Sequence, residues 1–215
     1  MNRDFITFDI LGEANMSELA NVKLPDITLY DYYRRLLNRE ILINVDIDEG
    51  VVEWTQLILE WNRYDAEHNI PIEERKKIKI WINSNGGDLN AIMHFIQVIS
   101  LSKTPVMTIG MGKCYSSGGL LLMAGHKGLR YIFSSTHALV HDGSAGCIAD
   151  TGKLLDNLEY TKKIENETKE YILSHTLITE DLYERNYRKD WWMTSDDIIK
   201  YGLADEIITD LSVVY

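Results

Sequence analysis

The sequence contains few of the residues that would build a disulfide framework or a metal centre. Its 215 residues include only two cysteines, Cys114 and Cys147. Two cysteines are too few for a disulfide framework, and no Cys-x-x-Cys pair or His/Cys cluster suggests a bound metal. This usage fits a reducing compartment, so we expect a cytoplasmic protein.

Long apolar runs and an excess of positive charge are also missing. No run approaches the roughly 20 apolar residues that span a bilayer, and the first nine residues carry acids where a signal peptide would be apolar. Lys and Arg number 22 against 33 Asp and Glu, which gives a formal charge of −11. Nucleic acids and anionic membranes attract clustered Lys and Arg, so we expect neither as a partner.

The composition is that of one ordinary globular domain, with 45% hydrophobic and 26% charged residues. Residues 1–25 mix apolar and acidic side chains without periodicity, so we expect an N-terminal arm there. Residues 26–215 show no internal repeat and no linker, and a single domain is predicted over this range.

Hydrophobic periodicity predicts strands and helices that alternate along the chain. The predicted strands are 40–45, 77–83, 105–110, 130–133, 138–140 and 206–209. The predicted helices are 48–66, 89–102, 148–176, 179–188 and 195–201, and a further helix follows the turn at 112–117. We also expect a short helix or turn within 26–39 and a polar loop at 67–76. This alternation is typical of an α/β fold with a largely parallel sheet.

The stretch 110–125 combines small and polar residues with a following apolar run, which predicts a strand end, a tight turn and a buried helix. Ser116 and Ser117 fall at that turn, where backbone N–H groups lack helical partners. A serine there can attack a carbonyl while those N–H groups hold the oxyanion. By itself, the same pattern is more often only a helix N-cap.

A second turn, Asn83–Asp88, follows the predicted strand 77–83. In adjacent parallel strands both turns lie at the carboxyl edge of the sheet, where α/β proteins place their sites. Paired glycines let the backbone approach a ligand closely. The N–H groups of Gly87 and Ser117 are therefore the candidates for an oxyanion hole.

A nucleophilic serine also needs a base and a group that orients the base. Of the six histidines, only His141 lies at the carboxyl end of a predicted strand, facing the proposed site. The remaining candidates lie in loops, on helices or at the other strand end (His68, His94, His126, His137, His175). Among 33 acidic residues, the pattern alone selects no third member.

Four segments resemble the proteolytic subunit of the Clp protease (ClpP), and they occur in that family's order. They are Ile-Asn-Ser-Asn-Gly-Gly at 82–87, the small-residue turn at 112–119, Ala-Leu-Val-His at 138–141 and Tyr-Gly-Leu-Ala-Asp-Glu at 201–206. Ser116 follows Gly87 by 29 residues, His141 follows Ser116 by 25, and Asp190 follows His141 by 49. These separations match the family's pattern.

The resemblance implies a serine endopeptidase with Ser116, His141 and Asp190 as its triad and the N–H groups of Gly87 and Ser117 as its oxyanion hole. It implies the ClpP/crotonase-like fold of repeated β-α-β units, with 148–176 as a long protruding handle helix. In such proteins two stacked heptameric rings enclose a chamber, and an ATP-driven AAA+ unfoldase feeds in unfolded polypeptides. The arm 1–25 would then be an axial loop or a propeptide. No metal or organic cofactor is required, and this chain has no P-loop of its own.

Several positions depart from the family's pattern. Asn85 stands where proline is usual, which should loosen the turn. Residues 113–115 are larger than the family's small residues, so the S1 region should differ. Asp142 follows His141 and could compete for its hydrogen bond, and the polar insert 67–76 is extra.

Two other classes of function are compatible with parts of the sequence. A crotonase-type acyl-CoA enzyme shares a related sheet and a two-amide oxyanion hole. A non-catalytic or regulatory ring subunit would only assemble, although such subunits usually lack at least one triad residue. An ordinary α/β-hydrolase is disfavoured, because 114–118 lacks the first glycine of G-x-S-x-G and the histidine precedes the acid.

Overall fold

The computed structural model describes residues 27–143 and 150–215. The predicted arm, Cys147 and the first residues of the predicted helix 148–176 lie outside these ranges. The chain forms α2 (Ile27–Asn38), β1 (Glu40–Ile43), α3 (Val51–Glu67), η1 (Ile72–Glu74), β2 (Ile78–Ser84), α4 (Leu89–Leu101), β3 (Val106–Tyr115), α5 (Ser117–Met123), β4 (Arg130–Ile132), β5 (His137–Val140), α6 (Thr151–His175), α7 (Glu180–Asn186), β6 (Trp191–Met193), α8 (Ser195–Lys200), β7 (Glu206–Ile207) and η2 (Leu211–Val214).

The strands of the described ranges form one sheet that divides at β3. The main path runs β1-β2-β3-β4-β7, and every pairing along it is parallel. The first half of β3 pairs with β4 through Thr108–Gly110, whereas its second half pairs with β5 through Lys113–Tyr115. The predicted α/β fold with a mostly parallel sheet is confirmed, and only β5 and β6 pair antiparallel.

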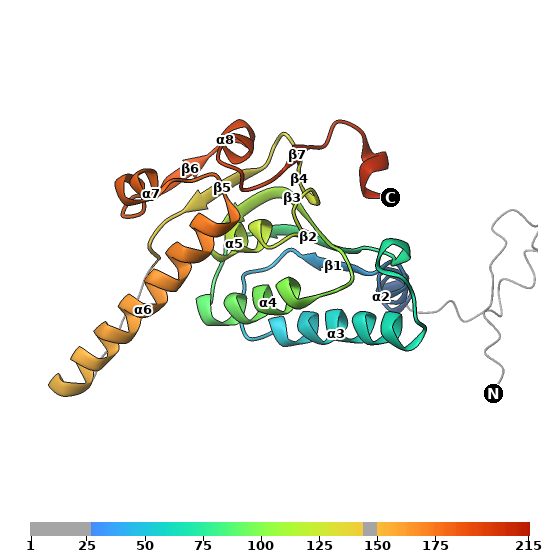
Figure 1. Cartoon of the computed structure of the whole chain (residues 1–215), viewed down its shortest axis with the longest axis horizontal. Helices are drawn as coiled ribbons and strands as arrows, with labels where there is room; N and C mark the ends of the chain where they lie inside the picture. Colours follow the sequence, from blue (N-terminus) through green and yellow to red (C-terminus); the bar gives the residue numbers. More distant parts are fainter. Residues whose placement is uncertain (1–26, 144–149) are drawn as a thin grey trace, which may run out of the picture.

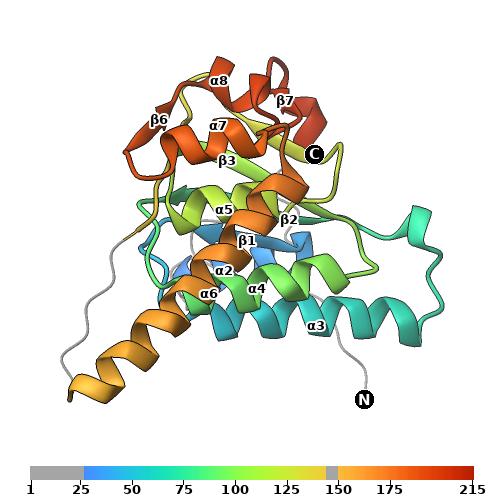
Figure 2. The ribbon, with the colours of Figure 1, turned by 60° about the vertical axis from the view of Figure 1, so that its left-hand side comes forward.

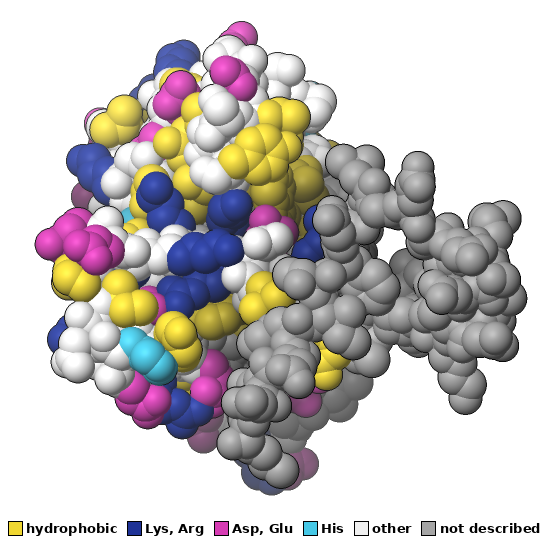
Figure 3. Space-filling model, turned by 90° about the vertical axis from the view of Figure 1, so that its right-hand side faces the viewer, with side chains coloured by type: hydrophobic (Ala, Val, Ile, Leu, Met, Phe, Trp, Pro, Cys, Tyr) yellow, Lys and Arg dark blue, Asp and Glu magenta, His cyan; other side chains and the backbone are white. Residues whose placement is uncertain are grey.

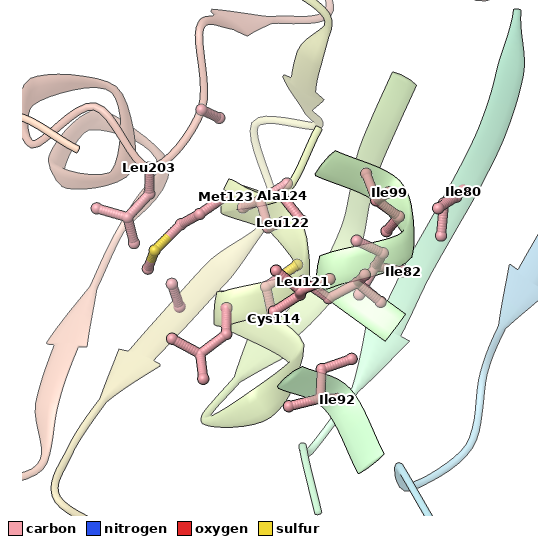
Figure 4. Close-up of a cluster of buried hydrophobic side chains, with 14 of the residues drawn as sticks. Ile80, Ile82, Ile92, Ile99, Cys114, Leu121, Leu122, Met123, Ala124 and Leu203 are labelled. Atoms are coloured by element: carbon pink, nitrogen blue, oxygen red, sulfur yellow. The ribbon is translucent and has the colours of Figure 1, made fainter. Parts of the chain in front are cut away.

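The main core lies between one face of the sheet and helices α3, α4 and α5 (Figure 1). Alternate residues of β2 point into it, because successive side chains of a strand face opposite ways. Figure 4 shows how α4 and α5 contribute to this cluster beside β2. The labelled side chains are Ile80, Ile82, Ile92, Ile99, Cys114, Leu121, Leu122, Met123, Ala124 and Leu203. The core thereby packs α5 against β2 and β3, the two strands that lie before it in the chain.

The opposite face of the sheet carries a smaller apolar cluster. Met107 and Ile109 of β3 pack there with Val214 of the C-terminal turn η2, and partly buried aromatic residues surround them. The surrounding residues are Trp81, Leu129, Tyr131, Phe133 and Ile208. This second cluster explains why the strand residues on both faces of β3 are apolar.

Helix α6 extends well beyond the rest of the molecule (Figures 1 and 2). It is attached at its C-terminal end, where the Tyr171 hydroxyl donates to the Leu120 carbonyl at 3.1 Å. Arg130 Nη1 donates to the carbonyl of His175, the last residue of the helix, at 2.8 Å. A cation at this position also interacts favourably with the helix dipole. The long protruding helix predicted from the sequence is therefore present, and none of the helices in the described ranges could cross a membrane.

Two predictions about the strands were wrong. The strand predicted to end at Gly110 continues to Tyr115, because its second half gains β5 as a new partner. Strand β6 was not predicted at all: only three residues long, it forms by antiparallel pairing with β5. Both errors have the same origin, since pairing with a distant segment adds backbone hydrogen bonds that local sequence does not reveal.

The insert 67–76 forms the predicted loop, with one turn of 3₁₀ helix in it. Lys76 binds it to the end of α2, since Lys76 Nζ donates to the Leu37 carbonyl at 2.9 Å and to Asn38 Oδ1 at 3.1 Å. Figure 3 views the molecule from the end where α2 and the insert lie, and Lys and Arg side chains gather on this face. The insert is therefore part of the folded body rather than a detached loop.

A buried ion pair connects α3 to the start of β1. The two terminal guanidinium nitrogens of Arg39, Nη1 and Nη2, donate to Asp65 at 2.7 and 2.6 Å, and the Thr104 hydroxyl donates to the same carboxylate at 2.7 Å. Asp65 is fully buried. Burial acts to raise the pKa of Asp65, but the hydrogen bonds from Arg39 and Thr104 outweigh it and the net pKa is lowered.

We expect Asp65→Ala to lower the free energy of unfolding by about 3 kcal/mol, because it leaves the Arg39 charge buried and unpaired. The contribution of Asp65 should be full above about pH 4 and should be lost as the pH falls through its lowered folded-state pKa. Urea unfolding at pH 7 and at lower pH values measures both effects. Glu60→Gln is the control, because it breaks an exposed ion pair with Arg63 on the same helix. A change no larger than that of the control would contradict the assignment.

Candidate active site

Two turns meet at the carboxyl edge of the sheet, as predicted. The Ser117 hydroxyl donates to the Gly87 carbonyl at 2.9 Å, which joins the turn after β3 to the turn after β2. Ile47 holds the other side of the second turn: its N–H donates to the Gly86 carbonyl and its carbonyl accepts from the Asp88 N–H, both at 2.8 Å. The Gly86–Gly87 turn is thus fixed between two neighbouring segments.

Glycine is required at both positions of this turn. Gly86 and Gly87 have φ angles of +97° and +148°, which L side chains rarely adopt. A Cβ at Gly87 would lie 2.0 Å from the Ile47 carbonyl oxygen, and one at Gly86 would lie 2.7 Å from the Ser116 Cβ. The glycines therefore allow the two turns to approach within van der Waals contact.

Ser116 has a backbone conformation that is unusual for a residue other than glycine, with φ 52° and ψ −122°. Hydrogen bonds hold this conformation on both sides. Its N–H donates to the Leu139 carbonyl at 2.9 Å, and its carbonyl accepts from the N–H groups of Gly119 and Leu120. Strained backbone that persists through such bonds is typical of functional sites. Ser117, by contrast, is buried and its hydroxyl donates to Gly87, whereas Ser116 is partly exposed.

A cleft of about 840 Å³ opens in front of Ser116, and His141 and Gly87 also line it. His141 directly follows β5, the strand that pairs with the second half of β3. Its Nε2 atom is buried and has no hydrogen-bond partner in the described part of the chain. Buried ring nitrogens normally have a hydrogen-bond partner. The missing partner leaves Nε2 available to a group that binds in the cleft.

Asp190 lies beside the other ring nitrogen of His141, Nδ1. Its Oδ1 is 3.7 Å from His141 Nδ1, and the aspartate side chain is 65% exposed. The unpredicted strand β6 begins at the next residue, and its pairing with β5 brings Asp190 close to His141. A carboxylate beside Nδ1 favours the tautomer that carries its proton there and leaves Nε2 as an acceptor.

The two amides predicted for the oxyanion hole have no other function in the fold. Among the described residues, neither the Gly87 N–H nor the Ser117 N–H donates a hydrogen bond. The two groups lie on the joined turns, and a Cβ at Gly86 would be 3.0 Å from Ser117 N. Unused donors beside a serine that lines a cleft can stabilise negative charge on a bound carbonyl oxygen.

Two other candidates for catalytic chemistry are occupied by structural roles. Cys114 is completely buried, and burial raises the pKa of its thiol to about 12, so it is not a nucleophile. Asp205, the acid of the motif near the C-terminus, accepts from Arg130 Nε at 3.0 Å and Nη2 at 2.5 Å and from the Gly128 N–H at 2.7 Å. These contacts connect β7 to β4 and leave Asp205 unavailable to any histidine.

The far wall of the cleft comes from α6 and α7, and sequence reasoning did not find it. Lys169 of α6 donates to Glu180 and Glu184 of α7, and the Tyr183 and Tyr187 rings stack at 5.3 Å. The orientation of α6 relative to α7 determines which of their residues face the cleft. No local sequence pattern predicts this orientation. In the described ranges, no group of three or more His, Cys, Asp or Glu residues could hold a metal ion.

Comparison with known proteins gives a clear family assignment. The family model described as Clp protease matches residues 26–210. The chain belongs to the Clp protease family. It is similar to the ATP-dependent Clp protease proteolytic subunit of Deinococcus radiodurans, with 28% identity over 180 residues that cover 83% of this chain and 85% of that protein.

The departures from the family's pattern have different structural consequences in this Clp protease family member. Of residues 113–115, Cys114 faces the core, whereas Tyr115 lines the cleft and contacts Trp192 edge to face at 5.1 Å. No hydrogen bond within the described ranges joins Asp142 to His141, so the competition considered from the sequence is not seen. Asn85 is held by hydrogen bonds on both sides.

We expect Gly87→Ala to lower the free energy of unfolding by about 3 kcal/mol or more, because the added Cβ overlaps the Ile47 carbonyl and the backbone is strained. Chemical unfolding measures this. Gly128→Ala is the matched control, since Gly128 also has a positive φ of +83° but no atom lies within 4 Å of its added Cβ. It should cost only about 1 kcal/mol. Equal losses in both variants would show that the close approach at Gly87 is unimportant.

Proposed function

We propose that this protein is a serine endopeptidase that hydrolyses peptide bonds of unfolded polypeptides, with Ser116, His141 and Asp190 as its triad. The single observation that carries the proposal is the state of the His141 ring. Its buried Nε2 has no partner in the described ranges and belongs to a residue of the Ser116 cleft, while Nδ1 faces Asp190. A peptide carbonyl bound in the cleft would complete this arrangement.

The first half of the reaction forms an acyl-enzyme. His141 Nε2 takes the proton of the Ser116 hydroxyl as Oγ attacks the peptide carbonyl carbon, and the carbonyl π electrons move onto oxygen. The Gly87 and Ser117 N–H groups stabilise this oxyanion. When the intermediate collapses, the C–N bond breaks and His141 gives the proton to the leaving amine.

The second half repeats these steps with water. His141 takes a proton from the water that attacks the ester carbonyl, and the C–O bond to Ser116 then breaks as the proton returns to Oγ. Asp190 stabilises the imidazolium that forms in each half and does not itself accept the proton. The residues present suffice for this chemistry without a cofactor.

We propose further that copies of the chain form stacked rings through α6. This helix exposes Leu154, Leu155 and Leu158 near its free end, with 62% of Leu155 accessible. Exposed leucines on a protruding helix favour contact with another protein surface. The relative from Deinococcus radiodurans is named as the proteolytic subunit of an ATP-dependent protease, and by analogy an AAA+ unfoldase would supply this protein with substrates.

One observation favours the alternative of a non-catalytic ring subunit. The 3.7 Å between His141 and Asp190 is longer than a hydrogen bond, and Asp190 is mostly exposed. Catalytic hydrogen bonds are often long before substrate binds, so this distance does not by itself exclude activity. Membership of the Clp protease family favours a peptidase over the crotonase-type enzyme considered from the sequence.

We expect a fluorophosphonate probe to label Ser116 stoichiometrically, as located by peptide mapping. Ser116→Ala should abolish labelling, and His141→Ala should slow it by at least about a thousandfold, because the hydroxyl loses its general base. His137→Ala is the matched control: it removes the exposed histidine at the other end of β5 and should leave the rate unchanged.

Labelling should be repeated with a candidate unfoldase present. If folded, ring-forming protein is labelled at Ser116 only with the unfoldase, the triad closes on assembly with that partner. If no label appears under either condition, the protein is a scaffold subunit and the proposed activity is wrong.

We expect Leu155→Asp to reduce the mass of the assembly by about half in sedimentation velocity, because a charge in an apolar contact between rings would separate them. Lys163→Asp is the control, since it introduces the same side chain at an exposed position of the same helix. Sedimentation of the unmodified protein only as a monomer under all conditions would contradict ring formation.

A further inference from the structure

The backbone ladders on both sides of β2 are interrupted just before the Gly86–Gly87 turn. On the β1 side, the pairing ends at Ile43–Ile82 and resumes at an isolated bridge between Ile47 and Gly87. On the β3 side, Ile82 pairs with Gly110 but Ser84 pairs with Cys114, so β3 contains extra residues there. The residues between these points cannot be held by regular sheet hydrogen bonds.

Side chains span both interruptions. Asn83 Nδ2 donates to Asn44 Oδ1 at 2.6 Å, and Asn83 Oδ1 accepts from the Lys113 N–H at 3.1 Å. Asn85 repeats this arrangement two residues later: Nδ2 donates to Asp46 Oδ1 at 3.1 Å, and Oδ1 accepts from Lys113 Nζ at 3.2 Å. Each asparagine therefore connects β2 to the segments on both sides of it, where the backbone pairing is irregular.

The charges beside Asn85 fix the direction of its amide. Its N–H faces the carboxylate of Asp46 and its oxygen faces the ammonium of Lys113, so both bonds are charge-assisted and stronger than neutral ones. A flipped amide would place oxygen against carboxylate and nitrogen against ammonium, and both contacts would be repulsive. The amide thus has one orientation that satisfies both neighbours.

Asn85 is two residues from Gly87 and lines the same cleft as Ser116. The hydrogen bonds of Ile47 to Gly86 and Asp88 hold the far side of the turn. The Asn85 bonds hold the near side, between the Ser84–Cys114 pair and the Ile47–Gly87 bridge. Asn85 is therefore one of the residues that restrain the turn on which the Gly87 N–H lies.

We propose that Asn85, held between Asp46 and Lys113, is a positioning residue that keeps the Gly87 N–H directed at the oxyanion. This inference rests on the proposed peptidase function and names a residue that tunes its oxyanion hole. Proline would stiffen this position through its ring, whereas here two hydrogen bonds restrict it.

The test exchanges the amide and the carboxylate between positions 46 and 85. Asn85→Asp places two carboxylates against each other and removes the donor, so we expect kcat for a peptide ester to fall about tenfold, with KM changed less than twofold. Asp46→Asn keeps an acceptor for Asn85 but removes the charge from that bond, so its kcat should fall less than that of Asn85→Asp. In the double variant, the introduced amide can donate to the introduced carboxylate, which still accepts from Lys113. Its kcat should therefore recover to within about threefold of the original value.

Two further measurements separate positioning from general loss of stability. The affinity for a peptide boronic acid, which forms a tetrahedral adduct with a serine, should fall with kcat and recover in the double variant. The peptide that covers Gly86–Asp88 should exchange its amide hydrogens faster in Asn85→Asp and return to the original rate in the double variant. Asn69→Asp makes the same chemical change in the insert and should alter none of these quantities.

The possible results decide between the alternatives. If Asn85→Asp keeps both kcat and the exchange rate within twofold of the unmodified protein, or if the double variant fails to recover either, the positioning role is overturned. If the unmodified protein neither hydrolyses esters nor reacts with a fluorophosphonate, the proposed function fails instead. The exchange rates then decide alone whether Asn85 orders the turn.

Discussion

The close approach of the Gly86–Gly87 turn to its two neighbours is the constraint on which the site depends. A Cβ at Gly87 would lie 2.0 Å from a carbonyl oxygen, so any residue other than glycine would overlap the neighbouring backbone. The Ser117 hydroxyl bonds across to the same glycine. The carbonyl of Gly87 is therefore satisfied, whereas its N–H donates to no group among the described residues.

The site also depends on the fork of the sheet at β3, where this strand changes its pairing partner. Its first half belongs to the main sheet with β4, and its second half turns to pair with β5. This change of partner brings the end of β5, and therefore His141, to the strand end that carries Ser116. The fork thus brings Ser116 and His141, which are 25 residues apart in the sequence, to the same cleft.

The region after α6 completes the site and also connects it to the proposed assembly. Residues of α6 and α7 form one wall of the cleft, while Asp190 lies between α7 and β6. The base of α6 is attached through Tyr171 and Arg130, and its free end exposes leucines. The leucines of the proposed contact and part of the cleft wall therefore lie on the same helix.

Much of this arrangement could be read from the sequence, because its causes are local. Alternating apolar residues determined β2, helical spacing determined α4, and paired glycines followed by small residues determined the two turns. The pattern pointed to Ser116 or Ser117 and, by position, to His141, whereas Asp190 and the triad as a set came from the resemblance to a known family. Only the tertiary structure decided the second half of β3, the strand β6 and the side-chain bridges of Asn83 and Asn85. Each of these depends on hydrogen bonds between segments far apart in the chain, whose partners no local periodicity specifies.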